Sequence, residues 1–321
     1  MPKNWVLKSI APHDFYLCLD IDSYWDFEHN PESIYEQGFN RPLNLADGNS
    51  VIVNIQFNGE VEAPSFAITC NESLTNEQIT EANVQLARIL GTNLDLRPLY
   101  EHAASDPILG PYLNEYYGLK RISRASLFEE TINRIVQMNL SHKPTARKMM
   151  YKVREKYGNA IMTSEGTVAA WPRPDQLKDA TPEHIRACGP TVRKGEYIIR
   201  MAEQIVEGSL DINWLDTKAD PTTFVNSMIK IKGIGPSAAQ QLVLTRDRTD
   251  GAFPSTKKSG EEQGLRKWIL LTYGVDANTA TEEDFLELTK SWRNYESVAI
   301  EFLYLNWINS YKSRKNQKST S

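Results

Sequence analysis

The chain is poor in cysteine. It has 321 residues and three cysteines, Cys18, Cys70 and Cys188, which lie far apart and share no C-x-x-C spacing. Isolated thiols of this kind build neither the paired framework of small secreted domains nor a four-cysteine zinc or iron–sulfur site. We therefore expect no disulfide framework and no cysteine-bound metal or cluster, and we predict that the protein uses no cofactor.

Long apolar runs are also missing. No stretch approaches the roughly 18 consecutive apolar residues that a membrane-spanning helix needs. The N-terminus, MPKNWVLKSIAPHDFYLCLD, has no long apolar core followed by a small-residue cleavage site. We expect a soluble intracellular protein without a membrane partner, located in the cytoplasm or nucleoid, or in the nucleus of a eukaryote.

The chain has no overall positive charge. Its net charge is −5, which taken alone argues against a nucleic-acid partner. However, residues 1–100 carry 14 Asp or Glu and 5 Lys or Arg, a net of −9, whereas the remainder carries 27 and 31, a net of +4. Local patches, rather than the overall balance, set binding to phosphates. Residues 143–156 form such a patch, with Glu155 as their one acid, and this patch is either a solvated helix face or a contact with a nucleic-acid backbone.

The sequence pattern divides the chain into two parts. Its length, with 40% hydrophobic and 24% charged residues, predicts more than one domain. Residues 1–105 predict a small α+β domain, in which Thr75 and Gln78 form a capping box that opens a helix ending at Gly91. Strands are predicted at the β-branched and aromatic segments WVLKSIA, FYLCLDI, SVIVNIQF and SFAITC.

Residues 106–312 predict an all-α domain. A capping box from Ser126 to Glu129 opens a helix that runs to about residue 140. Proline in the first turn marks further helix starts at Thr181-Pro182 and Asp220-Pro221, and AAWPRPDQL predicts a loop. Residues 313–321 predict a basic, polar tail.

The segment IKGIGPSAAQQL, residues 231–242, ends one predicted helix and begins another within a few residues. Gly233 and Gly235 permit the backbone angles that such a turn needs, and Pro236 suits the first turn of the new helix. Ile234 can fill the angle between the two helices. A phosphate can approach such a turn closely, because it has free N–H groups and few side chains. The alternative is a plain corner between helices that binds nothing.

Five motifs occur in a characteristic order: SLFEETINRIVQMNLSHKPTARKM, AAWPRPDQLKDATPEHIRACG, RKGEYIIRMAEQIVEG, IKGIGPSAAQQLVL and WRNYESVAIEFLYLNW. Through them nearly the whole chain resembles the helix-hairpin-helix DNA glycosylase superfamily, most closely its 3-methyladenine (alkylpurine) branch. The resemblance implies an α+β N-terminal domain followed by an all-α helix-hairpin-helix glycosylase core. It also implies an enzyme that flips a damaged base out of double-stranded DNA and hydrolyses its N-glycosidic bond.

The resemblance places a catalytic carboxylate after the hairpin, where the family pattern is FP-x-x-D followed by LGLRR. Here the text is FPSTKKSGEEQGLRKW. Counting from Phe253-Pro254 puts Lys257 in that place, whereas counting back from Gly264 puts Glu262 there. We predict an insertion with Glu262 as the acid; the weaker candidates are Glu261 and Asp250. If Glu261 and Glu262 only cap a helix, the chain is a catalytically impaired protein that binds damaged DNA.

The resemblance also implies a base pocket, lined by Ser237, Gln241, Trp292 and Tyr295. Ser237 stands where bifunctional members carry a nucleophilic lysine, so the resemblance implies base release without lyase activity. Aromatic side chains suit electron-poor alkylated purines. The polar Ser237 and Gln241 leave oxidised guanine open as an alternative substrate. Glu296 stands where the family usually has arginine.

Contacts with DNA are implied at two turns. Met138 and Asn139 stand where family members insert a wedge into the gap left by the flipped base. At the hairpin, phosphate contacts are implied for Lys232, Gly233, Ile234 and Gly235, and a monovalent cation is implied at the backbone carbonyls of Lys232 and Ile234. We expect a monomer.

Overall fold

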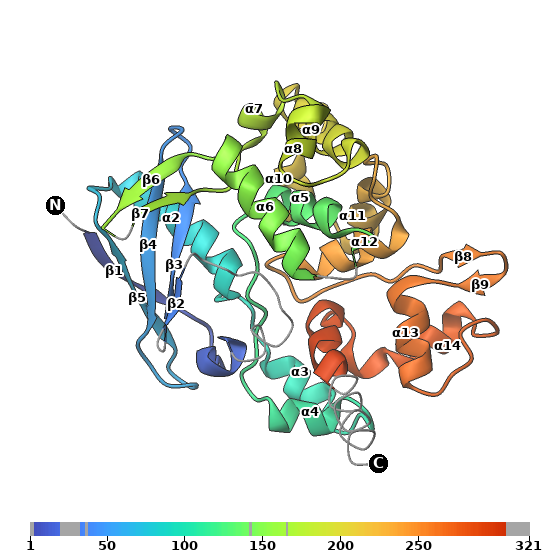
Figure 1. Cartoon of the computed structure of the whole chain (residues 1–321). Coiled ribbons are helices and arrows are strands. Elements are labelled where there is room, and N and C mark those ends of the chain that lie inside the picture. Colours follow the sequence, from blue (N-terminus) through green and yellow to red (C-terminus); the bar gives the residue numbers. More distant parts are fainter. Residues whose placement is uncertain (1–2, 20–32, 36–37, 141–142, 165, 306–321) are drawn as a thin grey trace, which may run out of the picture.

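The computed structural model describes residues 3–19, 33–35, 38–140, 143–164 and 166–305 (Figure 1). The predicted tail at 313–321 and the end of the last predicted helix lie outside these residues. Within the described part of the chain, no helix is both long and apolar enough to cross a membrane.

The N-terminal part is built on an antiparallel sheet with the strand order β1-β5-β4-β3-β2. Side chains alternate along β4 and β5, so that Val53 and Phe66 are fully buried while their neighbours are only half-buried. This alternation is what the β-branched and aromatic segments predict for a sheet with one covered face. The strands are β1 (Lys3–Lys8), β2 (Ser33–Tyr35), β3 (Gly38–Asn44), β4 (Ser50–Phe57) and β5 (Ser65–Cys70).

Helix α2 (Asn76–Leu90) follows the sheet as predicted. The Thr75 hydroxyl accepts the Gln78 N–H, and the Gln78 side chain accepts the Thr75 N–H at 2.8 Å, which completes the capping box. Gly91, with φ 63°, ends the helix. Its buried face, which includes Leu86 and Leu90, joins the core under the sheet.

The described part of the segment FYLCLDI is not a strand. Residues 15–19 are helical, because the Asp14 carboxylate accepts the N–H of Leu17 at 3.0 Å and so starts a helical turn. Phe15 and Cys18, three residues apart, are both buried on one side of that turn. The strand prediction was wrong here because a helical spacing of two apolar residues within a short aromatic run is hard to tell from a strand.

The rest of the chain is mainly helical (Figure 1). Ser126, Thr181 and Asp220 cap their helices through the side chain, as predicted. The described C-terminal helical residues are 296–305. The other elements are α3 (Arg97–His102), α4 (Gly110–Glu115), α5 (Leu127–Gln137), α6 (Lys143–Tyr157), α7 (Pro174–Leu177), α8 (Pro182–Ala187), α9 (Val192–Val206), α10 (Ile212–Thr217), α11 (Pro221–Met228), α12 (Pro236–Leu242), α13 (Gly264–Thr272), α14 (Glu282–Leu288) and the 3-10 turns η1 (Val243–Thr245) and η2 (Lys290–Trp292).

The all-α prediction for this part needs correction in two places. A hairpin of β6 (Ala160–Thr163) and β7 (Gly166–Ala169) follows α6 and lies beside the N-terminal sheet (Figure 1). A second, smaller hairpin of β8 (Lys257–Lys258) and β9 (Glu261–Glu262) precedes α13. Both are short antiparallel ribbons, whose few residues give only a weak periodic signal in sequence.

A buried ionic layer joins the sheet to the helices. Arg41 of β3 pairs with Glu129 of α5 at 2.5 Å, and the Trp171 ring lies under the guanidinium groups of Arg41, Arg124 and Arg154 at 5.4–5.9 Å. The Glu129 carboxylate is thus used for this contact rather than for the second half of a capping box at Ser126. Because a buried charge without its partner is costly, this layer holds the two parts in one arrangement.

Candidate nucleic-acid interface

The glycine-rich turn between α11 and α12 has the tight form that its sequence predicts. The Ile234 N–H donates to the Ile231 carbonyl at 3.0 Å, and both side chains are 4% exposed, so Ile234 fills the angle between the helices. Gly235 is the N-cap of α12 and is exposed, with no atom within 4 Å of the position a Cβ would take. The backbone at Gly235 is therefore open to a group that approaches from solvent.

Gly233 is required by the packing behind the turn. Its φ is +98°, which disfavours a side chain, and an added Cβ would lie 2.2 Å from the Tyr197 ring. Tyr197 belongs to α9 and is buried. The hairpin therefore rests directly on α9.

Helix α9 also holds the predicted wedge turn. The Lys194 ammonium donates to the carbonyls of Val136 at 2.7 Å and Met138 at 2.6 Å, and so satisfies the C-terminal end of α5. Asn139, next along the turn, is exposed with φ +58°. Burial lowers the pKa of Lys194. One helix therefore fixes both turns that the resemblance assigns to DNA, with Lys194 on one and Tyr197 on the other.

Replacing Lys194 with Met is expected to slow base release about tenfold while leaving DNA affinity nearly unchanged, because two charge-assisted hydrogen bonds that orient the Met138-Asn139 turn are lost. Single-turnover base release and the fluorescence of 2-aminopurine next to the lesion would measure this. Arg200→Met, which removes an exposed cation from the same helix, is the matched control. Equal effects of the two variants would contradict a positioning role for Lys194.

Where the sequence predicts an insertion before the acid, the structure has the short β8–β9 ribbon. The two positions reached by the two ways of counting, Lys257 and Glu262, are direct partners across the β8–β9 ribbon. The residues between them form the turn of the ribbon, so the chain returns at Glu262 to a position opposite Lys257. Lys257 is exposed, whereas Glu262 is 2% exposed.

The Glu262 carboxylate is held by several donors. It accepts hydrogen bonds from the Ser255 hydroxyl at 2.5 Å, from the Thr256 N–H at 2.7 Å and from the Gln263 N–H at 3.2 Å, and Arg266 lies 3.9 Å away. Burial raises its pKa, but these hydrogen bonds and the Arg266 charge outweigh burial, and the pKa falls below its usual value. Glu262 is therefore ionised at neutral pH, and it also ties the base of the ribbon.

The weaker candidates for the acid are differently placed. Glu261 is exposed and lies 3.8 Å from Lys267. Asp250 forms a two-point ion pair with Arg248 at 2.6 and 2.7 Å. Glu296 accepts the Gly251 N–H at 3.1 Å, and burial raises its pKa.

The structure separates the four predicted pocket residues. Ser237 is exposed, and Gln241 and Tyr295 are half-buried. Trp292, in contrast, is fully buried, and its Nε1–H donates to the Tyr273 hydroxyl at 3.2 Å, so it offers no open ring face to a base. That hydroxyl also hydrogen-bonds to the buried Asp106 carboxylate, a network that sequence reasoning missed.

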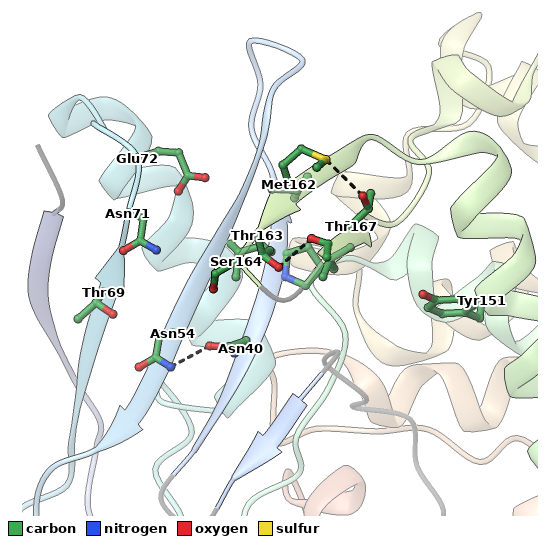
Figure 2. Close-up of a pocket in the computed structure, with 15 residues that line it drawn as sticks. Asn40, Asn54, Thr69, Asn71, Glu72, Tyr151, Met162, Thr163, Ser164 and Thr167 are labelled. Atoms are coloured by element: carbon green, nitrogen blue, oxygen red, sulfur yellow. Dashed lines mark hydrogen bonds between the residues drawn. The ribbon is translucent and has the colours of Figure 1, made fainter.

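A separate cavity of about 540 Å³ lies between the N-terminal sheet and the β6–β7 hairpin (Figure 2). Amide and hydroxyl side chains line it, with Asn54 donating to Asn40 at 2.8 Å across neighbouring strands, and Glu72 is the one charged residue among its described lining residues. Without a cation, this cavity does not suit a phosphate backbone. Neither it nor the hollow of about 730 Å³ beside α2 and α10 is lined by Ser237, Gln241 or Tyr295.

Comparison with known proteins points to one superfamily. No family model matches the chain. A DNA-3-methyladenine glycosylase of Bacillus subtilis is 28% identical over 212 residues, which cover 65% of this chain and 67% of that protein.

Solved structures share the fold over nearly the whole chain. A 3-methyladenine DNA-glycosylase from Archaeoglobus fulgidus superimposes with a TM-score of 0.71 at 19% identity, covering 94% of this chain and 97% of that one. The 8-oxoguanine glycosylase/lyase of Clostridium acetobutylicum does so with a TM-score of 0.64 at 15% identity, covering 95% and 97%. Both include a small N-terminal sheet with helices, as here. The resemblance carried by the five motifs is therefore confirmed: the chain is similar in sequence to a glycosylase of the 3-methyladenine branch, and it shares its fold with the helix-hairpin-helix DNA glycosylase structures above.

Proposed function

We propose that this protein is a DNA glycosylase, a hydrolase of N-glycosyl bonds that binds double-stranded DNA and releases a damaged base from it. The observation that carries the proposal is the open turn at Gly235, backed by the buried Ile234 and held on α9 by the Gly233–Tyr197 contact. Such a turn grips a DNA backbone without reading sequence. The carbonyls of Lys232 and Ile234 are the proposed ligands of a monovalent cation that would bridge to phosphate.

The proposed chemistry uses Glu262. As the bond between the base and C1′ of the sugar lengthens, the bonding electrons leave with the base nitrogen and positive charge develops on the sugar. An ionised carboxylate beside C1′ stabilises that charge, and a water molecule then adds to C1′ and loses a proton. The lowered pKa of Glu262 suits this role. At 2% exposure, Glu262 requires that DNA binding open a path to it.

We propose base release without strand cutting, because Ser237 occupies the position where a nucleophilic lysine would stand and offers no amine for a Schiff base. With alkylated duplex DNA and borohydride, no protein–DNA adduct is expected, and strands should break only after alkali. Trapping of a covalent adduct by borohydride would show lyase chemistry, with Lys257 and Lys258 as the amines to replace first.

Alkylated purine, such as 3-methyladenine, is the proposed lesion, which the sequence relative's name supports. A second candidate, oxidised guanine, is favoured by the polar Ser237 and Gln241 at the proposed base pocket. Single-turnover base release from duplexes that carry one lesion each would separate them. Release from neither lesion class, with DNA binding retained, would favour a catalytically impaired protein that binds damaged DNA.

A further inference from the structure

The β8–β9 ribbon lies where the sequence departs from the FP-x-x-D pattern, and it projects from the body of the helical part (Figure 1). Its turn is made by Ser259 and Gly260, which both have positive φ, as a tight two-residue hairpin requires. Its base is tied by Glu262, whose carboxylate accepts the Thr256 N–H and whose own N–H donates to Asn278 at 3.1 Å. The ribbon is thus a short, anchored arm.

The arm presents two lysines, each across the ribbon from a glutamate, whose ammonium groups form no ion pair among the described residues. Its two acids each have a basic neighbour on α13: Glu261 lies 3.8 Å from Lys267, and Glu262 lies 3.9 Å from Arg266. The side chains of Lys257 and Lys258 are both exposed, and neither ammonium group makes an ion pair or hydrogen bond with any residue in the described part of the chain. Two ammonium groups are therefore available to an anionic partner.

The arm starts close to the hairpin. Gln240 of α12, five residues after Gly235, donates to the Pro254 carbonyl at 3.0 Å and accepts the Leu265 N–H at 3.0 Å. This one side chain therefore holds both ends of the loop that carries the ribbon. The two residues of β8 extend about 7 Å, a length over which a DNA strand presents roughly two phosphates.

We propose that the β8–β9 ribbon is a second backbone grip, in which Lys257 and Lys258 contact DNA phosphates beside those held at the Gly235 turn. The inference rests on the proposed function, because it needs DNA bound across the hairpin. Its physical consequence is the release of counterions from the phosphates that the lysines neutralise.

The test compares full-length natural protein, the double variant Lys257→Gln/Lys258→Gln, and the control Lys3→Gln/Lys8→Gln, which removes the same charge from the distant strand β1. Anisotropy of a fluorescein-labelled duplex at several NaCl concentrations gives log K against log salt. The slope should become shallower by about 0.9 for each lysine engaged, or about 1.8 for both. The ribbon variant would then lose roughly tenfold less affinity between 50 and 200 mM salt than the natural protein.

Thermal unfolding of all three proteins checks that the fold is unchanged. A salt slope that is the same in the ribbon variant and the natural protein would overturn the proposal, as would an equal change in the control. If the natural protein binds no DNA at any salt concentration, the proposed function itself fails. The two failures are therefore distinguishable.

Discussion

Replacing Glu262 with Gln should lower base release from alkylated duplex DNA by at least about 100-fold, because the substitution removes the negative charge that stabilises the sugar cation. The amide keeps the shape of the side chain, so the ribbon and α13 should stay in place. Single-turnover base release measures the effect, and anisotropy with the same duplex should show affinity within a few-fold of the natural protein.

Two companion variants sharpen this prediction. Glu261→Gln removes an exposed neighbouring charge and should leave release nearly unchanged, whereas Glu262→Asp keeps the charge on a shorter arm and should retain part of the rate. Because Glu262 accepts three hydrogen bonds, thermal unfolding must show that the Gln variant remains folded. Undiminished release by a folded Glu262→Gln protein would move the acid elsewhere, with Asp250 the next to replace.

The second large effect is expected at the hairpin. Gly233→Ala should destabilise the protein by about 3 kcal/mol, because the new Cβ meets the buried Tyr197 ring and the residue keeps a positive φ. The melting temperature should fall by roughly 5–10 °C. Thermal unfolding followed by circular dichroism would measure this, and a melting temperature within 1–2 °C of the natural value (well below the roughly 5 °C expected) would show that α9 does not support the hairpin.

Gly235→Ala is the matched variant with the opposite pattern. At φ −90°, with no atom within 4 Å of the new Cβ, the fold should tolerate it without loss of stability. The methyl group would, however, stand where a phosphate must approach the backbone, so DNA affinity should fall about tenfold. If Gly235→Ala binds DNA as tightly as the natural protein, the turn is only a corner between helices.

Local signals in the sequence predicted a structural feature correctly where the contacts that form it lie within a few residues of one another. Thr75 and Gln78 cap α2, Pro236 opens α12, and Ile234 fills the hairpin, because each depends on neighbours along the chain. Two local anchors, Phe253-Pro254 and Gly264, also predicted an insertion before Glu262, and the β8–β9 ribbon lies between them. The order of five such motifs predicted the resemblance to DNA glycosylases that the comparisons confirm.

Short helices and strands were harder to predict from the sequence. The helical turn at residues 15–19 and the β6–β7 hairpin are each only a few residues long, so their apolar spacing does not separate helix from strand. Their form is set by packing: Phe15 and Cys18 enter the hydrophobic core, and β6–β7 lies beside the N-terminal sheet.

The sequence by itself determined the capped helices, the glycine turn and the kinds of residue at the candidate site. Only the tertiary structure decided how they are held. Lys194 meets Met138 across 56 positions, Trp292 turns into the core toward Tyr273, and Gln240 ties the ribbon to α12. Such contacts join segments that are far apart in the sequence, so no local periodicity predicts them. Burial and hydrogen bonding select these contacts only when the whole chain has packed.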